Sequence, residues 1–237
     1  MVVQLFDENY YTNNGQIGNR PALGWYKKLA KRYLDSAHIL DFGCGTGTLI
    51  QRLSPLGQVD GFDTSVFALN KAKSSNPRSN FYSQLEEIPT DTFSAVVSIH
   101  GFKHLNPLEL FYAIDILVRS LKANGRLLII TPQFGGFAHK RTGSFWSGFS
   151  DSTHCNLMSA SNVRDLLFGN GFSPIREFTD GPWNGPYLTG LKIEKLILQV
   201  PCALQVFSGR KFIPVGFGES YVAVWQLNSR SPSSNSV

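Results

Sequence analysis

Two carboxylates and three glycines near the start of the sequence have the types and spacing of a small-molecule binding site. In "ILDFGCGTGTL", Asp41 stands two residues before the first of three alternating glycines, Gly43, Gly45 and Gly47. Glycine adopts positive φ without steric cost and lets a ligand approach the backbone closely. Asp63 closes the next apolar run, "VDGFDT", where a carboxylate can accept hydrogen bonds from ligand hydroxyls. The alternative for Asp63 taken alone is a cap on the helix that starts near residue 65.

Three histidines and one aspartate in the middle of the chain have the chemistry to move a proton. Histidine titrates near neutral pH and can act as a general base. His100 and His104 follow the apolar run "FSAVVSI", whereas His154 lies with Asp151 in "GFSDSTHCNLMS". His154 with Asp151 is the leading candidate for a base, and His104 is the next. The alternative is a structural role, in which His104 fixes a loop and Asp151 caps or orients it.

These residues need a scaffold that brings distant parts of the chain to one place. Apolar runs of strand length alternate with helical segments, which predicts parallel strands joined by right-handed crossovers in a doubly wound α/β sheet. Ligands bind such sheets beyond the carboxyl ends of the strands, where the glycine turn lies. Strands are predicted at 38–42, 59–64, 79–85, 93–100, 126–132, 171–179 and 218–227, and helices at 21–35, 48–56, 65–75, 108–121 and 191–206.

Composition narrows the class of protein. The chain has 237 residues, 42% of them hydrophobic, which fits one globular domain with a sizeable core. It contains no apolar run of about 18 residues and no signal-peptide pattern, so we expect a soluble, cytoplasmic protein without stable membrane insertion. Three cysteines without ligand spacing predict reduced thiols and no metal site. The net charge of +5 is spread along the chain, so we expect no nucleic-acid partner.

The spacing of the glycines separates two classes of ligand. A dinucleotide fingerprint needs a glycine at position 48, where this chain has threonine. The run "LDFGCGTG" instead resembles the first motif of the class I S-adenosylmethionine-dependent methyltransferases. The resemblance covers residues 39–131, and more loosely extends to 172, because "SQLEEIP" and "LKANGRLLI" follow in the family's order. It implies a mostly parallel, seven-stranded Rossmann-like sheet with an antiparallel last strand, and S-adenosyl-L-methionine as the cofactor.

The resemblance also implies roles at the cofactor site. The glycines would admit the methionine part and the ribose, and Asp41 would bind the ammonium group of the cofactor. Asp63 would accept both ribose hydroxyls. Gln84 and Leu85 would border the adenine edge, with Phe62 or Phe67 packed on its face. The other residues assigned to the cofactor are Cys44, Thr64, Ser98 and His100.

The sulfonium methyl group of this cofactor is already activated, so the protein mainly aligns the acceptor and manages its proton. We expect a small-molecule acceptor that is methylated on a hydroxyl oxygen. N- or C-methylation and a non-catalytic cofactor-binding protein of the same fold are the alternatives. A nucleic-acid or protein acceptor is less favoured because "HGFK" replaces the Asn/Asp-Pro-Pro-aromatic run of amine-modifying relatives. Tyr11, Phe145 and Trp146 are assigned to the acceptor, and the chain departs from the family at Ser94 and Lys103, where acids are usual.

Flanking segments extend the predicted domain. Residues 1–36 are expected to form an N-terminal flap and helix, with Tyr10, Tyr11 and Arg20 over the cofactor. The methyltransferase domain is assigned to 37–228, with an insertion at about 180–215, and 229–237 to a disordered tail. The helix at 191–206 is expected to pack on the sheet. A substrate lid, a homodimer contact and a membrane-surface helix are the alternatives for it. The loop at 133–150 is either a pocket wall or an irregular connection.

Overall fold

The computed structural model describes residues 6–18, 20, 22–35, 37–181, 192–208, 210 and 212–229, without the side chains of 192–198 and 206. The strands are β1 His38–Phe42, β2 Gln58–Phe62, β3 Phe81–Tyr82, β4 Phe93–Ile99, β5 Leu121–Pro132, β6 Phe172–Thr179 and β7 Ser220–Leu227. The α-helices are α1 Glu8–Asn13, α2 Ala22–Tyr33, α3 Thr48–Leu53, α4 Val66–Ser75, α5 Pro107–Ser120, α6 Phe137–Thr142, α7 Ala160–Gly169 and α8 Lys192–Ser208. Among the short 3₁₀ turns are η2 Leu85–Glu87 and η3 Phe102–His104.

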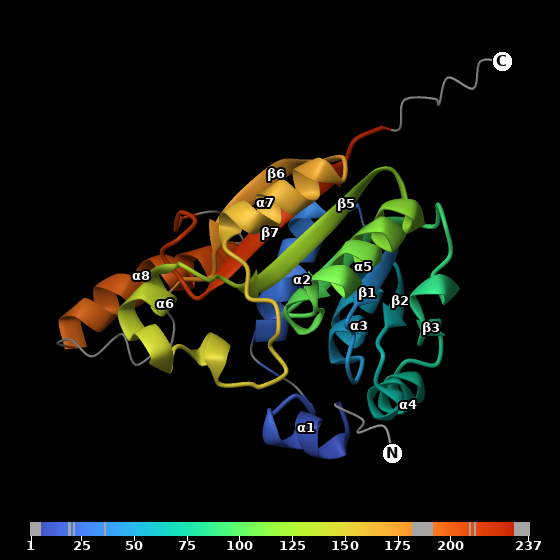
Figure 1. The fold of residues 1–237 in the computed structure, drawn as a ribbon, viewed down its shortest axis with the longest axis horizontal. Coiled ribbons are helices and arrows are strands. Elements are labelled where there is room, and N and C mark those ends of the chain that lie inside the picture. The colour runs from blue at the N-terminus through green and yellow to red at the C-terminus, as the bar shows by residue number, and fades with distance from the viewer. Residues whose placement is uncertain are drawn as a thin grey trace.

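A single sheet of these seven strands forms the centre of the molecule (Figure 1). The strand order is β3-β2-β1-β4-β5-β7-β6. Strands β1 to β5 pair in parallel, whereas β7 is antiparallel to both β5 and β6. The predicted doubly wound, mostly parallel sheet with an antiparallel last strand is confirmed.

Helices cover both faces of the sheet because successive side chains of a strand point to opposite sides. On β7, Tyr221, Ala223 and Trp225 pack in one core with α5 and α7. Val222 and Val224 pack in a second core with α2 and α3. All five side chains are fully buried, as expected for a strand covered on both faces. Two apolar layers therefore hold the carboxyl ends of the strands in fixed register.

Strands β3 and β5 differ most from the sequence predictions. Strand β3 has only two residues, in place of 79–85, and it lies at the edge of the sheet. Strand β5 begins at Leu121, directly after α5, because Leu121 pairs with Phe93 of β4. The left-handed residue of this connection is Asn124, with φ of 61°. Gly125 is needed for a different reason, since a Cβ there would lie 2.8 Å from a backbone carbonyl oxygen.

Helix α8 packs against the end of β6 and against α2. The Gln205 side-chain amide donates a hydrogen bond to the carbonyl of Thr179, and Lys28 lies 5.2 Å from the centre of the Phe207 ring. Residues 182–191 of the predicted insertion and 230–237 of the predicted tail lie outside the described residues. Within the described part of the chain, no helix is long and apolar enough to cross a bilayer.

Candidate active site

The glycine turn after β1 forms the floor of the candidate site. Gly43, Gly45 and Gly47 have φ of 79°, 52° and 76°, in the left-handed region that favours glycine. A Cβ on Gly47 would lie 2.6 Å from the side-chain nitrogen of Asn76, and one on Gly43 would lie 3.3 Å from the Cα of Gly101. The turn therefore needs glycine for its own conformation as well as for the approach of a ligand.

Asp41 provides a buried carboxylate with an unused oxygen. Its side chain is 2% exposed, and Oδ2 has no hydrogen-bond partner within the described residues. Burial, followed by the nearby Asp63 carboxylate, raises the pKa of Asp41 to about 7, and Arg20 offsets part of this rise. Because an unpaired buried carboxylate is costly, Asp41 is suited to bind a cation.

Asp63 lies just after β2 and ties the glycine turn to α4. Its Oδ2 accepts a hydrogen bond from the backbone N–H of Gly45 at 2.8 Å, and Oδ1 accepts one from Ser65 N–H at 2.9 Å. The side chain that caps α4 belongs to Ser65, which accepts from Ala68 N–H at 3.1 Å. Burial raises the pKa of Asp63, although the hydrogen bonds from the Ser65 and Gly45 N–H groups oppose the rise.

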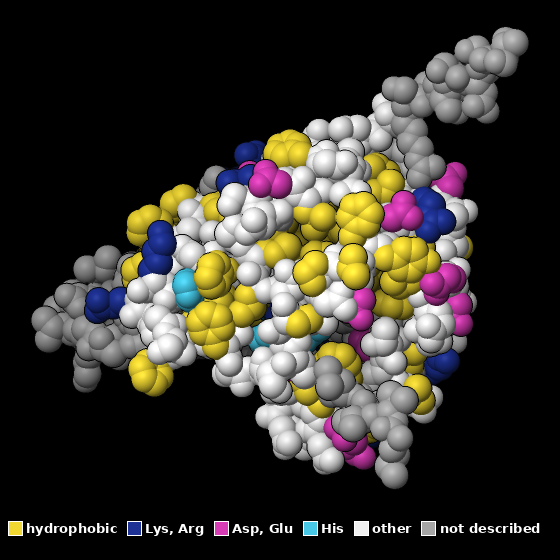
Figure 2. Space-filling view, in the orientation of Figure 1, with side chains coloured by type: hydrophobic (Ala, Val, Ile, Leu, Met, Phe, Trp, Pro, Cys, Tyr) yellow, Lys and Arg dark blue, Asp and Glu magenta, His cyan; other side chains and the backbone are white. Residues whose placement is uncertain are grey.

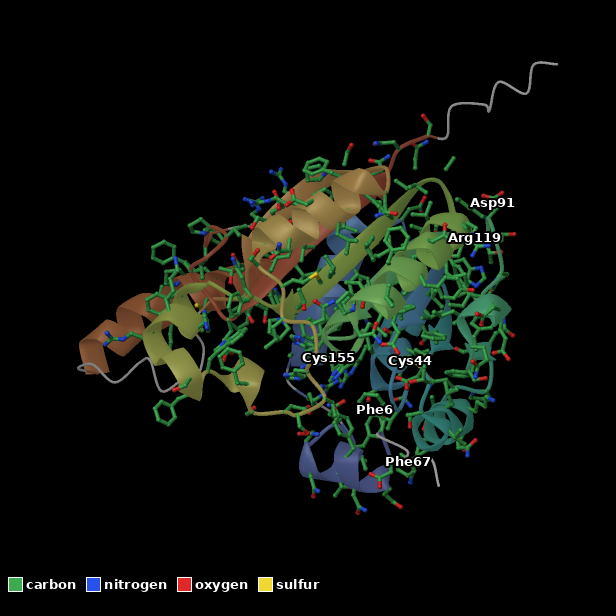
Figure 3. All side chains as sticks on the ribbon, in the orientation of Figure 1. Phe6, Cys44, Phe67, Asp91, Arg119 and Cys155 are labelled. Carbon is green, nitrogen blue, oxygen red and sulfur yellow. The ribbon has the colours of Figure 1, made fainter. Side chains whose placement is uncertain are left out.

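The N-terminal segment covers this carboxylate. Tyr11 of α1 is 4% exposed, and its ring lies 5.9 Å from the ring of Phe67. It lies close enough to Asp63 to lower the pKa of that carboxyl. The Ser65 hydroxyl donates to the carbonyl of Phe6 at 2.6 Å. Figure 3 shows Phe6 and Phe67 in the space between α1 and α4. The segment that the sequence predicted as a flap thus lies against the glycine turn.

The loop between β5 and α7 brings His154 and Asp151 together. His154 Nδ1 lies 2.8 Å from the carbonyl oxygen of Gly148, and because a carbonyl only accepts, this nitrogen carries the proton. Nε2 of the neutral ring is then unprotonated. It has no hydrogen-bond partner among the described residues and lies 3.5 Å from Asp151 Oδ2. Burial lowers the pKa of His154, with Lys103 adding to the effect and Gly148 and Asp151 opposing it.

Asp151 is held by donors from two segments. Its Oδ1 accepts from the backbone N–H and the hydroxyl of Thr153, at 2.9 and 2.6 Å. Its Oδ2 accepts from the hydroxyl of Tyr10, in α1, at 3.2 Å. Burial would raise the pKa of Asp151, but these hydrogen bonds and His154 outweigh it, so the net shift is downward. Asp151 is therefore ionised at neutral pH. The sequence analysis did not predict the hydrogen bonds from Thr153, although Thr153 lies in the same motif, "GFSDSTHCNLMS".

The other two predicted histidines lie at the end of β4. His104 Nδ1 is 2.9 Å from the Thr153 hydroxyl oxygen, and its ring centre is 5.0 Å from that of His154. Burial, followed by Lys103, lowers the pKa of His104 to about 4, so the ring is neutral at pH 7. His100 has φ of 60° and a buried Nδ1 without a partner in the described residues. Figure 2 shows histidine side chains at the junction between the body of the molecule and the lobe that carries α1.

Three neutral polar side chains line the ends of β4 and β5. Ser98 Oγ, Thr131 Oγ1 and Gln133 Oε1 are buried and have no hydrogen-bond partner among the described residues. By strand alternation, Ser98 and Thr131 point to the same face as Val96 and Ile129, which pack with α5. The sequence predicted Ser98 as a site residue but not Thr131 or Gln133. The position of Thr131 and Gln133 at the end of an apolar run is the sequence pattern that could have identified them as site residues.

The remaining predicted residues have varied environments. Cys44 is buried, and a Cβ on Gly61 of β2 would lie 2.8 Å from its sulfur. Gln84 precedes the η2 turn that begins at Leu85, and Thr64 is exposed on the way to α4. Phe145 is 87% exposed, whereas Trp146 is buried in a small separate core with Ala138 of α6. The loop at 133–150 is therefore partly helical, and these two aromatic side chains have opposite exposures.

The protein therefore has a doubly wound α/β fold, with the glycine turn, Asp41 and Asp63 at the carboxyl edge of its sheet. The family model of a methyltransferase domain matches residues 16–177. The chain belongs to that family, the class I S-adenosylmethionine-dependent methyltransferases, as its motifs predicted. It is a methyltransferase, with S-adenosylmethionine as the cofactor.

Solved structures share the fold at low identity. An S-adenosylmethionine-dependent methyltransferase from Archaeoglobus fulgidus aligns with a TM-score of 0.66 and 16% identity, over 93% of this chain and 100% of that one. A methyltransferase in a complex with an activator from Haloferax volcanii aligns with a TM-score of 0.65 and 13% identity, over 94% and 96%. The plantazolicin methyltransferase, in complex with SAH, aligns with a TM-score of 0.60 and 17% identity, over 94% and 91%. No curated protein matches the sequence.

Proposed function

We propose that the protein transfers the methyl group of S-adenosylmethionine to a hydroxyl oxygen of a small-molecule acceptor, with His154 as the general base. The observation that carries this proposal is the protonation state of the His154 ring. The Gly148 carbonyl fixes the proton on Nδ1 and leaves a buried Nε2, with no hydrogen-bond partner in the described part of the chain, beside an ionised Asp151. A hydroxyl nucleophile needs such a base, whereas a neutral amine needs mainly orientation.

The residues at the glycine turn fit the cofactor. The unpartnered Oδ2 of Asp41 suits its ammonium group, and the charge of Arg20, which already acts on Asp41, suits its carboxylate. The glycines leave room for the ribose and methionine parts, and Asp63 supplies oxygens for the ribose hydroxyls. Tyr11 lies near Asp63 and lowers its pKa, so its ring would move aside or rotate as those hydroxyls bind.

The bound cofactor supplies an activated methyl group for an in-line displacement. In this mechanism, Nε2 of His154 accepts the proton of the acceptor hydroxyl as the new carbon–oxygen bond forms. The resulting imidazolium donates from Nε2 to Asp151 Oδ2, which is 3.5 Å away before proton transfer. Tyr10 and Thr153 hold the carboxylate in position for this charge. The His154 side chain is 6% exposed, which supports a slender acceptor over a broad macromolecular surface.

Isotope labelling and single-turnover kinetics test the proposal. Transfer from ¹³C-methyl S-adenosylmethionine, followed by NMR of the product, identifies the methylated atom once an acceptor screen yields turnover. We expect an O-methyl product. His154→Ala should lower the single-turnover rate by roughly a hundredfold while leaving SAH affinity unchanged.

His104→Ala is the matched control, because the neighbouring His104 ring is hydrogen-bonded to Thr153. This substitution should lower the single-turnover rate less than His154→Ala does. An N- or C-methyl product, or a His154→Ala rate near that of the wild type, would contradict the assigned base. SAH binding without turnover of any acceptor would favour the non-catalytic alternative. The homodimer and the cytoplasmic location suggested by the sequence stay predictions.

A further inference from the structure

Lys103 is a cation at the acceptor side of the candidate site that the mechanism does not use. It lies in η3, directly after β4, and its carbonyl accepts hydrogen bonds from Cys155 N–H at 3.0 Å and Asn156 N–H at 3.1 Å. These bonds fix its backbone between β4 and the loop that carries His154. Among the described residues, no ion pair joins Lys103 to a carboxylate. Burial lowers its pKa to about 8, with Asp151 opposing the shift and Arg20 adding to it.

Few charged groups surround Lys103. The three nearby histidines, His100, His104 and His154, all have lowered pKa values, with burial as the first cause, so their rings are neutral. Among the described residues, Asp151 is the acid that raises the pKa of Lys103, and its oxygens also accept hydrogen bonds from Tyr10 and Thr153. The sulfonium of the methyl donor adds a further positive charge nearby.

Neutral hydrogen-bonding groups stand at the same strand ends. Ser98, Thr131 and Gln133 each hold a buried polar atom without a partner in the described residues. Their strands are adjacent, since Ser98 pairs in register with Ile129 and the N–H of His100 donates to Ile130 O at 2.7 Å. One ammonium group with several neutral donors and acceptors matches a singly charged group better than a phosphate dianion.

We propose that the acceptor carries a carboxylate and that the ammonium group of Lys103 binds it. This inference rests on the proposed function, because it names the substrate class of the same site. Lys103 has no ion-pair partner among the described residues, so a neutral acceptor would bury its ammonium group unpaired, which is unfavourable, whereas a carboxylate would pair with it. Lys103 thereby selects the acceptor, while His154 handles the proton.

Matched acids and amides test this inference. The probes are the three isomeric hydroxybenzoates, glycolate and lactate, each compared with its primary amide. Binding is measured by calorimetry on the SAH complex, and turnover is measured with radiolabelled S-adenosylmethionine. At least one acid should bind tenfold or more tightly than its amide. Lys103→Met should remove that preference, and Lys103→Arg should keep most of it.

Lys122→Met is the matched control, because Lys122 is an exposed lysine near the opposite, amino end of β5. It should leave the preference for acids unchanged. SAH affinity within about twofold of the wild type shows that Lys103→Met folds and binds cofactor. Equal binding of acids and amides, absence of binding by every acid, or a preference that survives Lys103→Met would overturn the inference. An acid preference combined with methylation of amines would support it and contradict only the hydroxyl assignment.

Discussion

The pH dependence of SAH affinity follows from the environment of Asp41. In the free protein, burial and the Asp63 charge raise the pKa of Asp41 to about 7. The ammonium group of the ligand pairs only with the ionised carboxylate, so binding draws the pKa of Asp41 downward. The affinity for SAH should therefore be highest well above pH 7. It should fall as the pH drops through 7, because Asp41 must then release a proton before SAH binds.

The size of the effect follows from the ionised fraction of Asp41. With a pKa of about 7, that fraction is roughly one-tenth at pH 6 and nine-tenths at pH 8. The dissociation constant of SAH should then be about tenfold larger at pH 6 than at pH 8, or about 1.4 kcal/mol. Near pH 7, complex formation should release about half a proton.

Isothermal titration calorimetry in buffers with different ionisation enthalpies measures both quantities. Asp41→Asn keeps the shape of the side chain but removes this titration, so its weaker SAH affinity should change little between pH 6 and pH 8. In the absence of SAH, this variant should melt several degrees above the wild type at pH 8, because a buried unpaired charge is removed. A tenfold pH effect that persists in Asp41→Asn would assign the proton to another group. A flat wild-type profile would refute the reasoning.

Further predictions concern the glycine turn and its carboxylate. Gly47→Ala should destabilise the protein by about 2 kcal/mol or more, since the new Cβ would lie 2.6 Å from Asn76 Nδ2. Gly135→Ala, at φ of 74° with no atom within 4 Å of the new Cβ, should cost only about 1 kcal/mol, and urea unfolding of both variants checks the difference. Asp63→Ala should weaken SAH binding by roughly 1.5 to 3 kcal/mol. Ser65→Ala, which removes the α4 cap but keeps the carboxylate, should lower stability by about 1 kcal/mol and leave SAH affinity within a few-fold, by calorimetry and thermal melts.

The seven strands were predictable because each depends on residues close together in the sequence, whereas helix α7 was not predicted. The continuous apolar run of β4 is buried on both faces, and the turn after β1 needs its glycines for their positive φ. Strand ends were less predictable, since pairing decides them. The pairing of Leu121 with Phe93 starts β5 directly after α5, and no local pattern announces that contact.

The candidate cofactor site was likewise predictable from local patterns, because Asp41 and the glycines stand within a few residues of one another. The acceptor side was not. The Tyr10 hydroxyl reaches Asp151 across 141 positions of the chain, and the ring proton of His154 depends on the Gly148 carbonyl. The sequence by itself determined which groups could hold the cofactor. Only the tertiary structure decided which nitrogen of His154 is unprotonated and which lysine lies near that ring, because burial and partners from other segments set both.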